Sequence, residues 1–227
     1  MSNLERADRD AILLHGVFAL ACLLILAAPL GAPVGQRVSG LVLLYNVALP
    51  LVAWRRGHPE WLKLWLFLLP LSALQVFPDW FLAAQLGVIE FPDTGALRIG
   101  PIPAFMAGLW TIPLFIIVLL GRRVAAQSTR NVALLAVALA SVLLFVGSEA
   151  TLWVIPIWHA RDVTMVAHVA VYLIVPEIIL GLSTFLAFES SLHRSIWHKL
   201  SGAFAVMLIY LGGLCFFYLV VEQLLLG

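Results

Sequence analysis

Three carboxylic acids lie within long apolar stretches of the sequence: Asp79, Glu149 and Glu177. An acidic side chain at the centre of a membrane helix costs at least about 2.5–3.5 kcal/mol on insertion scales, so an acid at that depth is a candidate functional group by default. A carboxylic acid that desolvation keeps neutral can donate a proton, and an ionised neighbour can accept one. The structural alternative is that each acid only makes hydrogen bonds between helices.

Position along the predicted helices places the three acids in one depth zone, in the outer half of the membrane. If their side chains face inward, they form a polar pocket that nearby aromatic and polar side chains can line. The residues expected to bind a substrate there are Trp80, Trp110, Trp153, His168 and Tyr172, with Trp158, Tyr45 and Tyr210 as further aromatic neighbours. On a continuous helix, His168, Tyr172 and Pro176 would share one face. The alternative is that the tryptophans belong to interfacial belts and that His168 is a packing residue.

Metal and thiol chemistry have little support in the sequence. The six histidines show no HxxxH or HxxHH spacing, and the two cysteines, Cys22 and Cys215, have no adjacent base. Basic residues do not cluster beyond the pairs Arg55-Arg56 and Arg122-Arg123. We therefore expect no metal, no cofactor and no nucleic-acid partner; protein partners cannot be read from the sequence.

The composition defines what must position these residues. The chain has 227 residues, of which 63% are hydrophobic and 11% charged, whereas soluble domains have about 45–50% apolar and about 25% charged residues. This excludes a soluble globular protein. Because a bilayer core of about 30 Å requires roughly 20 apolar residues per helix, we counted such stretches. There are seven, approximately at 11–30, 38–54, 61–83, 101–121, 131–156, 164–188 and 200–225.

These stretches predict an all-α polytopic membrane protein, with a single seven-helix transmembrane domain over residues 1–227. The first stretch is expected to be a retained helix rather than a secretory signal, because Glu5, Asp8 and Asp10 offset Arg6 and Arg9 in front of it. With seven spans, ten lysines and arginines fall on the side of the N-terminus and three, Arg37, Arg98 and Arg161, on the other. The positive-inside rule then places the N-terminus in the cytoplasm and the C-terminus outside, in the inner (plasma) membrane.

The third and fourth predicted helices resemble the fifth and sixth. Each pair has an acid near the outer end of its first helix and a proline in its second: Asp79 with Pro103, and Glu149 with Pro176. An outer loop containing aromatic residues connects the helices in each pair. This pattern indicates a degenerate two-helix repeat.

The same region resembles the lycopene cyclase domain, the small integral-membrane carotenoid cyclases of actinobacteria, archaea and fungi. The resemblance rests on Asp79-Trp80 at a helix end, the Gly87-Val-Ile-Glu-Phe91 turn and Ile99-Gly-Pro-Ile-Pro103, and is best over residues 42–121. It implies non-redox cyclisation of a linear carotenoid end group by proton addition, with no obligatory metal. The sequence departs from the family at Ala104-Phe105-Met106 and at Asn46, where the family carries acids.

Three functions are compatible with these observations. The first is an isoprenoid cyclase or isomerase in which Asp79, Glu149 and Glu177 serve as proton donor, cation stabiliser and base. The second is a non-catalytic lipid-binding or assembly protein in which the acids are structural. The third is a small proton-coupled transporter, which would need a path for water to the acids.

Overall fold

The protein is almost entirely helical in the computed structural model, which describes residues 3–225. The helices are α1 (Asn3–Ala27), α2 (Val34–Arg56), α3 (Pro59–Leu74), α4 (Val76–Trp80), α5 (Met106–Leu109), α6 (Thr111–Ala125), α7 (Arg130–Ser141), α8 (Gly147–Leu152), α9 (Ile174–Ser191) and α10 (Ile196–Tyr218). Segments η1 (Phe81–Leu86), η2 (Val142–Val146) and η4 (Leu219–Leu225) are π-helical, and η3 (Val171–Leu173) is a 3-10 turn.

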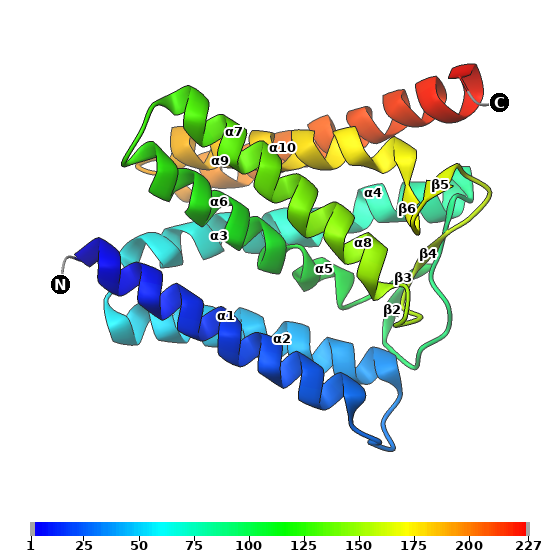
Figure 1. The fold of residues 1–227 in the computed structure, drawn as a ribbon, viewed down its shortest axis with the longest axis horizontal. Coiled ribbons are helices and arrows are strands. Elements are labelled where there is room, and N and C mark those ends of the chain that lie inside the picture. The colour runs from blue at the N-terminus through cyan, green and yellow to red at the C-terminus, as the bar shows by residue number, and fades with distance from the viewer. Residues whose placement is uncertain (1–2, 226–227) are drawn as a thin grey trace.

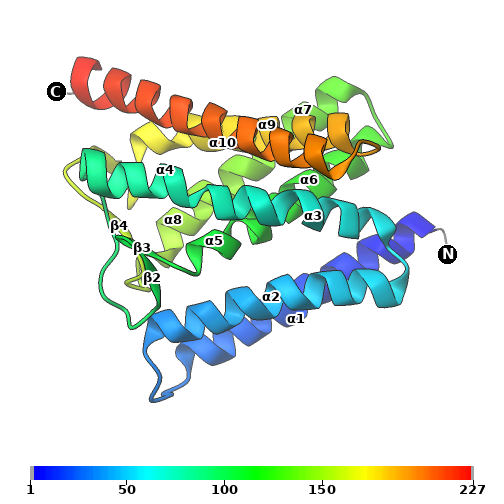
Figure 2. The same cartoon turned by 180° about the vertical axis from the view of Figure 1, so that it is seen from behind.

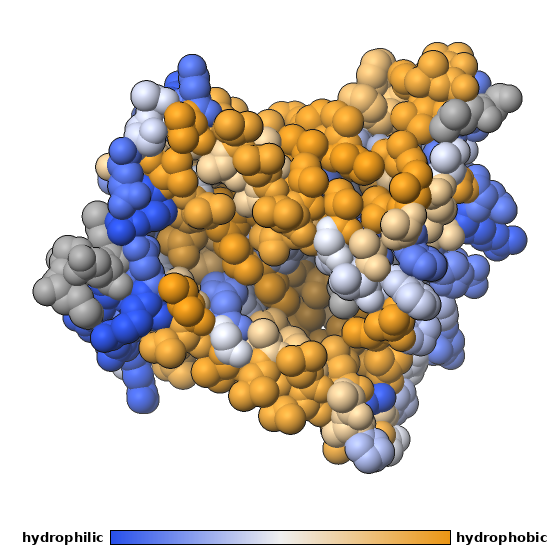
Figure 3. All heavy atoms as spheres, in the orientation of Figure 1, coloured by the Kyte–Doolittle hydropathy of each residue, from blue (hydrophilic) through white to orange (hydrophobic). Residues whose placement is uncertain are grey.

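Several of these helices run on directly into the next, so that seven helical spans within residues 3–225 are long and apolar enough to cross a membrane. They cover Arg6–Ala27, Val34–Arg56, Pro59–Leu86, Met106–Ala125, Arg130–Thr151, Val171–Ser191 and Ile196–Leu225. Figure 3 shows an apolar band between two hydrophilic ends of the molecule. The prediction of an all-α polytopic membrane protein with seven spans is confirmed.

The α1–α2 hairpin lies beside the other helices as a separate pair (Figure 1), while α3, α6, α7, α9 and α10 pack together. Helix α10 contacts both α9 and α3, and α7 contacts α6 and α9. Figure 2 shows α10, α3 and α2 in succession from behind. The two ends of the chain lie at opposite ends of the bundle, as an odd number of spans requires.

Short antiparallel strand pairs gather at the end of the bundle near the C-terminus. Strand β1 (Ile89–Glu90) pairs with β4 (His159–Ala160), β2 (Arg98–Ile99) with β3 (Ile102–Pro103), and β5 (Met165–Val166) with β6 (Val169–Ala170). The β1–β4 pair joins the loop after η1 to the loop after α8. These strands close the end of the bundle toward which Asp79 and Glu149 lie.

The predicted helices over 101–121, 131–156 and 164–188 were too long at this end. Helix α8 ends at Leu152 and the next helical turn begins at Val171, and the residues between them include Pro156, which has no N–H to continue a helix. Ala167 and His168 have φ angles of 49° and 68°, and form the turn between β5 and β6. His168 is therefore not helical, and the expected helical face of His168, Tyr172 and Pro176 is wrong.

Two π-helical segments adjoin the acids. Asp79 lies in α4, immediately before η1, and Glu149 lies in α8, immediately after η2. A π-helical turn widens the helix and re-aims the side chains on either side of it, and such turns are frequent at functional sites. Local sequence does not reveal these turns, since their residues have ordinary helix composition.

Candidate functional site: an apolar cavity with three acids

A cavity of about 350 Å³ lies between the α1–α2 hairpin and the other helices. This volume is within the range of roughly 300–1,000 Å³ typical of small-molecule sites. The residues that line it are Phe18, Cys22, Leu26, Val38, Leu41, Val42, Asp79, Leu82, Ile89, Met106, Leu109, Trp110, Ile112, Pro113, Ile116, Leu144, Phe145, Ser148, Glu149, Ile155, Ile157, Trp158, Leu173, Glu177 and Tyr210. The lining is predominantly hydrocarbon and aromatic, and its charged members are three carboxylic acids.

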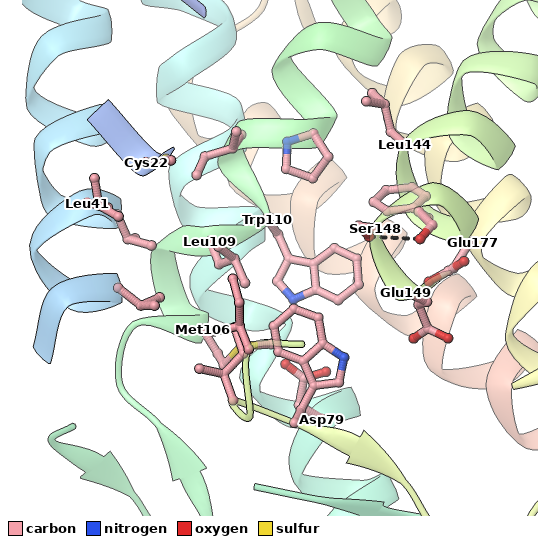
Figure 4. Close-up of a pocket in the computed structure, with 18 of the residues that line it drawn as sticks. Cys22, Leu41, Asp79, Met106, Leu109, Trp110, Leu144, Ser148, Glu149 and Glu177 are labelled. Atoms are coloured by element: carbon pink, nitrogen blue, oxygen red, sulfur yellow. Dashed lines mark hydrogen bonds between the residues drawn. The ribbon is translucent and has the colours of Figure 1, made fainter. Parts of the chain in front are cut away.

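All three predicted acids line this cavity, although they come from three separate spans (Figure 4). Asp79 and Glu177 are each only 4% exposed. One carboxylate oxygen of each, Oδ2 of Asp79 and Oε2 of Glu177, is buried without a hydrogen-bond partner among residues 3–225. The structure thus brings two glutamates that are 70 and 98 residues from Asp79 along the chain to the same cavity as Asp79.

Glu149 and Glu177 form the closer pair within the cavity. Figure 4 shows their side chains side by side on one wall, and the charge of Glu149 acts on the carboxyl group of Glu177. The backbone N–H of Ala170 donates a hydrogen bond of 3.3 Å to Oε2 of Glu149. Glu177 lies in the first turn of α9, where the positive end of the helix dipole favours negative charge.

Trp110 lies between Asp79 and the glutamate pair in the view of Figure 4. Its ring centroid is 5.8 Å from that of Tyr210 and 5.6 Å from that of Phe145. Its buried indole Nε1 makes no hydrogen bond of ordinary geometry within the described chain, but it lies near enough to the Asp79 carboxyl group to interact with it. An indole face beside carboxylic acids is an arrangement that stabilises a positive charge in an apolar environment.

The cavity opens sideways through the apolar band. Figure 3 shows a hollow on this face, bordered by hydrophobic residues, between the α1–α2 hairpin and the helices above it. Cys22 and Leu26 of α1 contribute to one side of the cavity, and Leu144 and Ser148 of η2 and α8 contribute to the other. The hollow therefore lies within the apolar band, at the side of the bundle on which α1 and α8 lie.

Four of the five residues predicted to bind a substrate do not line the cavity. Trp80 on α4 is 41% exposed, and Trp153, which follows the end of α8, is 55% exposed. His168 stacks on Trp153 with ring centroids 4.4 Å apart, on the β5–β6 turn. Tyr172 is buried instead against Tyr218, with centroids 5.6 Å apart. Trp110 lines the cavity as predicted, together with Trp158 and Tyr210, whereas Tyr45 does not.

The cavity wall contributed by α1 and α2 was not predicted from the sequence. Its members, among them Phe18, Cys22 and Val42, are small or apolar residues that no polar signal separates from lipid-facing positions. Glu222 was also missed: its Oε2 accepts hydrogen bonds of 3.0 Å from the N–H and the hydroxyl of Thr164. This pair ties η4 to the loop before β5, and the location of Glu222 at the end of a predicted span was the available signal.

One family model matches the chain, over residues 76–221: a domain of unknown function, DUF6989. The chain belongs to this family. The DUF6989 segment begins at α4 and contains all three acids, Trp110, Trp158 and Tyr210, while α1, α2 and α3 precede it. No curated protein and no solved structure matches the chain.

The residues that line the cavity of this DUF6989 protein determine which ligands and reactions it can accommodate. Within residues 3–225, no group of three or more His, Cys, Asp or Glu side chains is arranged to hold a metal ion. The described lining residues include no lysine, arginine or histidine, so an anionic head group would meet carboxyl groups without compensating charge. The arrangement suits an uncharged, apolar ligand and the movement of protons to and from it.

Proposed function

We propose that this protein is an integral-membrane enzyme that cyclises or isomerises an isoprenoid substrate by proton transfer, without redox chemistry. The observation that carries the proposal is the convergence of Asp79, Glu149 and Glu177 on one apolar, laterally open cavity. A neutral carboxylic acid adds a proton to a terminal alkene, and a carboxylate on another wall removes a proton from the resulting cation. The atoms of the substrate are conserved, so the product is an isomer.

The aromatic lining supports the same chemistry. Trp110, Trp158 and Tyr210 surround the space between the acids, and aromatic faces stabilise a carbocation that the apolar walls shield from water. The volume of about 350 Å³ accommodates the reacting end of a molecule, and the lateral opening lets the remaining hydrocarbon chain lie in the bilayer. The proposed partner is therefore a carotenoid-like isoprenoid held within the lipid bilayer.

The proposal includes an orientation. We infer that the N-terminus is cytoplasmic and the C-terminus outside, in the inner (plasma) membrane, because ten of the thirteen lysines and arginines fall on the N-terminal side of the spans. The end of the bundle that carries the strand pairs is then the outer one, and the acids lie in the outer half of the membrane.

Expression in cells that accumulate linear carotenoids or other polyprenyl compounds tests the function. Lipid extracts are separated by chromatography with mass detection for the wild type and for Asp79→Asn, Glu149→Gln and Glu177→Gln. Asp162→Asn is the matched control, because Asp162 is an exposed acid in the loop between β4 and β5, with a side chain 84% exposed. We expect a new product of unchanged mass that the cavity variants lose and the control retains.

The absence of a product from the wild type across the substrates, with the protein folded and inserted, would overturn the proposal. Protection of the protein by such a substrate against thermal unfolding, without any product, would instead favour the non-catalytic lipid-binding function. Uptake of a solute coupled to protons would favour the transporter.

A further inference from the structure

Gln75 is a buried amide next to the site that the cavity does not account for. Its exposed fraction is 0%, and both its side-chain nitrogen and its side-chain oxygen lack hydrogen-bond partners within residues 3–225. Ser72 shares both properties: its exposed fraction is 0% and its hydroxyl oxygen has no partner among the described residues. Neither side chain lines the cavity.

Ser72, Gln75 and Asp79 share one face of a continuous helix. The backbone N–H of Gln75 donates to the carbonyl oxygen of Leu71 at 3.0 Å, and the N–H of Asp79 donates to that of Gln75 at 3.2 Å, so α3 runs directly into α4. Residues three and four positions apart lie above one another on a helix. Gln75 and Ser72 therefore lie one and two turns behind Asp79, on the side that leads away from the strand pairs, where α3 packs against α10 and α5.

A buried amide without partners is expensive. Each unsatisfied donor or acceptor destabilises the fold, because it loses its hydrogen bonds to water and gains none in return, and three such atoms occur here within a single turn of helix. In proteins, groups of this kind are commonly satisfied by internal water molecules, which typically make about three hydrogen bonds each. Three neighbouring polar side chains provide the number of partners that one or two such molecules need.

We propose that Ser72 and Gln75 bind internal water behind Asp79, and that this water is the route by which the carboxyl group of Asp79 exchanges its proton. Asp79 lies at the boundary of two environments: it lines the apolar cavity on one side and shares its helix face with the water-binding amide on the other. Trp65, seven residues before Ser72, carries the next buried polar atom on that face, an indole Nε1 without a partner in the described chain.

The functional consequence rests on the proposed function. An apolar ligand in the cavity excludes water from that side, so a donor that has lost its proton needs another source. Water bound at Gln75 gives one proton to the Asp79 carboxylate and receives one from solvent, so that only O–H bonds break and form. Gln75 is thus a positioning residue, because it acts through the water and Asp79 rather than on the substrate.

Infrared difference spectroscopy of the full protein in lipid films tests this proposal without any substrate. The C=O band of the protonated Asp79 carboxyl group is assigned by its loss in Asp79→Asn, and its shift on transfer to heavy water gives the rate of proton exchange. In Gln75→Leu we expect the exchange to slow about tenfold, the factor that corresponds to one hydrogen bond of ordinary strength. We also expect the band to move to higher frequency, as for a carboxyl group that donates no hydrogen bond.

Thr184→Val is the matched control, because Thr184 has an exposed fraction of 0% and an unpartnered hydroxyl in the described chain but lies on α9. It should leave the Asp79 band and its exchange rate unchanged. Gln75→Met provides a second variant of similar size should Gln75→Leu fail to fold. Unchanged exchange and an unchanged band in a folded Gln75 variant would overturn the proposal, whatever the substrate experiments show; loss of the product alone would not.

Discussion

Glu149 and Glu177 are close to each other, but their carboxyl groups have different hydrogen-bond partners. Glu149 accepts a hydrogen bond from the N–H of Ala170, whereas Glu177 has one oxygen without a partner among the described residues and lies in the first turn of α9. Two carboxyl groups that close, in an apolar interior, repel when both are ionised. The difference in their surroundings is what separates a proton donor from a proton acceptor in paired-carboxylate sites.

This repulsion leads to a prediction about stability. We expect Glu177→Gln and Glu149→Gln each to raise the thermal unfolding midpoint in detergent at neutral pH, because an amide can occupy the apolar interior without the desolvation cost of a carboxylate and without repelling the neighbouring carboxyl group. The double variant should gain less than the sum of the two, with an interaction free energy of about 0.5–3 kcal/mol, as for residues whose charges influence each other. Asp79→Asn combined with Glu149→Gln is the control and should be closer to additive, since Glu149 lies beside Glu177 whereas Asp79 lies apart from both in Figure 4. Strict additivity for the glutamate pair would contradict the prediction.

Among single residues, the acids of the cavity could be predicted from the sequence, whereas the aromatic residues beside them could not. A carboxyl group within an apolar run is costly wherever it faces, so the run alone identifies Asp79, Glu149 and Glu177. A tryptophan is favourable against protein, lipid or head groups alike. Trp110 therefore could not be distinguished from Trp80 or Trp153, which face outward, until the packing of the helices was known.

At the scale of elements, the α1–α2 hairpin is the wall that makes the cavity. Near the N-terminus, Asp8 of α1 pairs with Arg123 of α6 at 2.9 Å, and Asp10 lies 2.9 Å from Nε2 of His58, which precedes α3. Asp10 also accepts hydrogen bonds of 2.8 and 3.0 Å from Arg56 of α2, which join the two helices of the hairpin. Near the cavity, Asn46 of α2 donates a hydrogen bond of 3.1 Å to the carbonyl oxygen of Gly108. A side chain at Gly108 would meet Val42 at 2.9 Å, so glycine is what permits this close approach of α2.

Because α1 forms one wall of the cavity, a larger side chain on α1 should fill the cavity and exclude the ligand. Cys22→Phe places an aromatic ring in the apolar space, and we expect loss of the isomerised product with an unfolding midpoint that is unchanged or higher, because the cavity has room for the added atoms. Cys215→Phe is the matched control: Cys215 is also partly buried but lies on α10 and does not line the cavity. Full product formation by a folded Cys22→Phe variant would show that the ligand does not occupy this space.

The strand pairs were beyond what apolar runs can predict. Residues 153–156 and 164–170 are hydrophobic enough to extend the neighbouring helices in a count of apolar residues, yet the chain turns at Ala167 and His168 with positive φ angles. A matching geometry precedes each second helix of the proposed repeat: the N–H of Ala104 donates to Leu97 at 2.7 Å, and the N–H of Val171 donates to Thr164 at 3.0 Å. The repeat itself stays a prediction, but these hairpins explain why both second helices begin later than their apolar runs.

At the scale of the whole molecule, the number of spans was predictable because hydrophobic length is a property of the sequence alone. Each span needs about 20 apolar residues whatever its neighbours, and the seven predicted stretches overlap the seven spans of the structure. The cavity was not predictable in this way, since it arises from the angle between the α1–α2 hairpin and the DUF6989 segment. That angle depends on contacts between residues far apart in the sequence, such as Asn46 with Gly108.

The orientation of the whole molecule is the last prediction. Ten lysines and arginines lie on the N-terminal side and three on the other. This distribution predicts that the C-terminus lies outside, because loops rich in lysine and arginine remain in the cytoplasm during insertion. In a bacterial host, a phosphatase that is active only outside the cytoplasm should be active when fused after the C-terminus and inactive when fused after Gln127, which lies between α6 and α7. The matched fusion after Asp162, between β4 and β5, should be active. The reverse pattern would place the acids in the inner half of the membrane. The cavity would then be within reach of the cytoplasmic leaflet, and the ligand would enter from that leaflet.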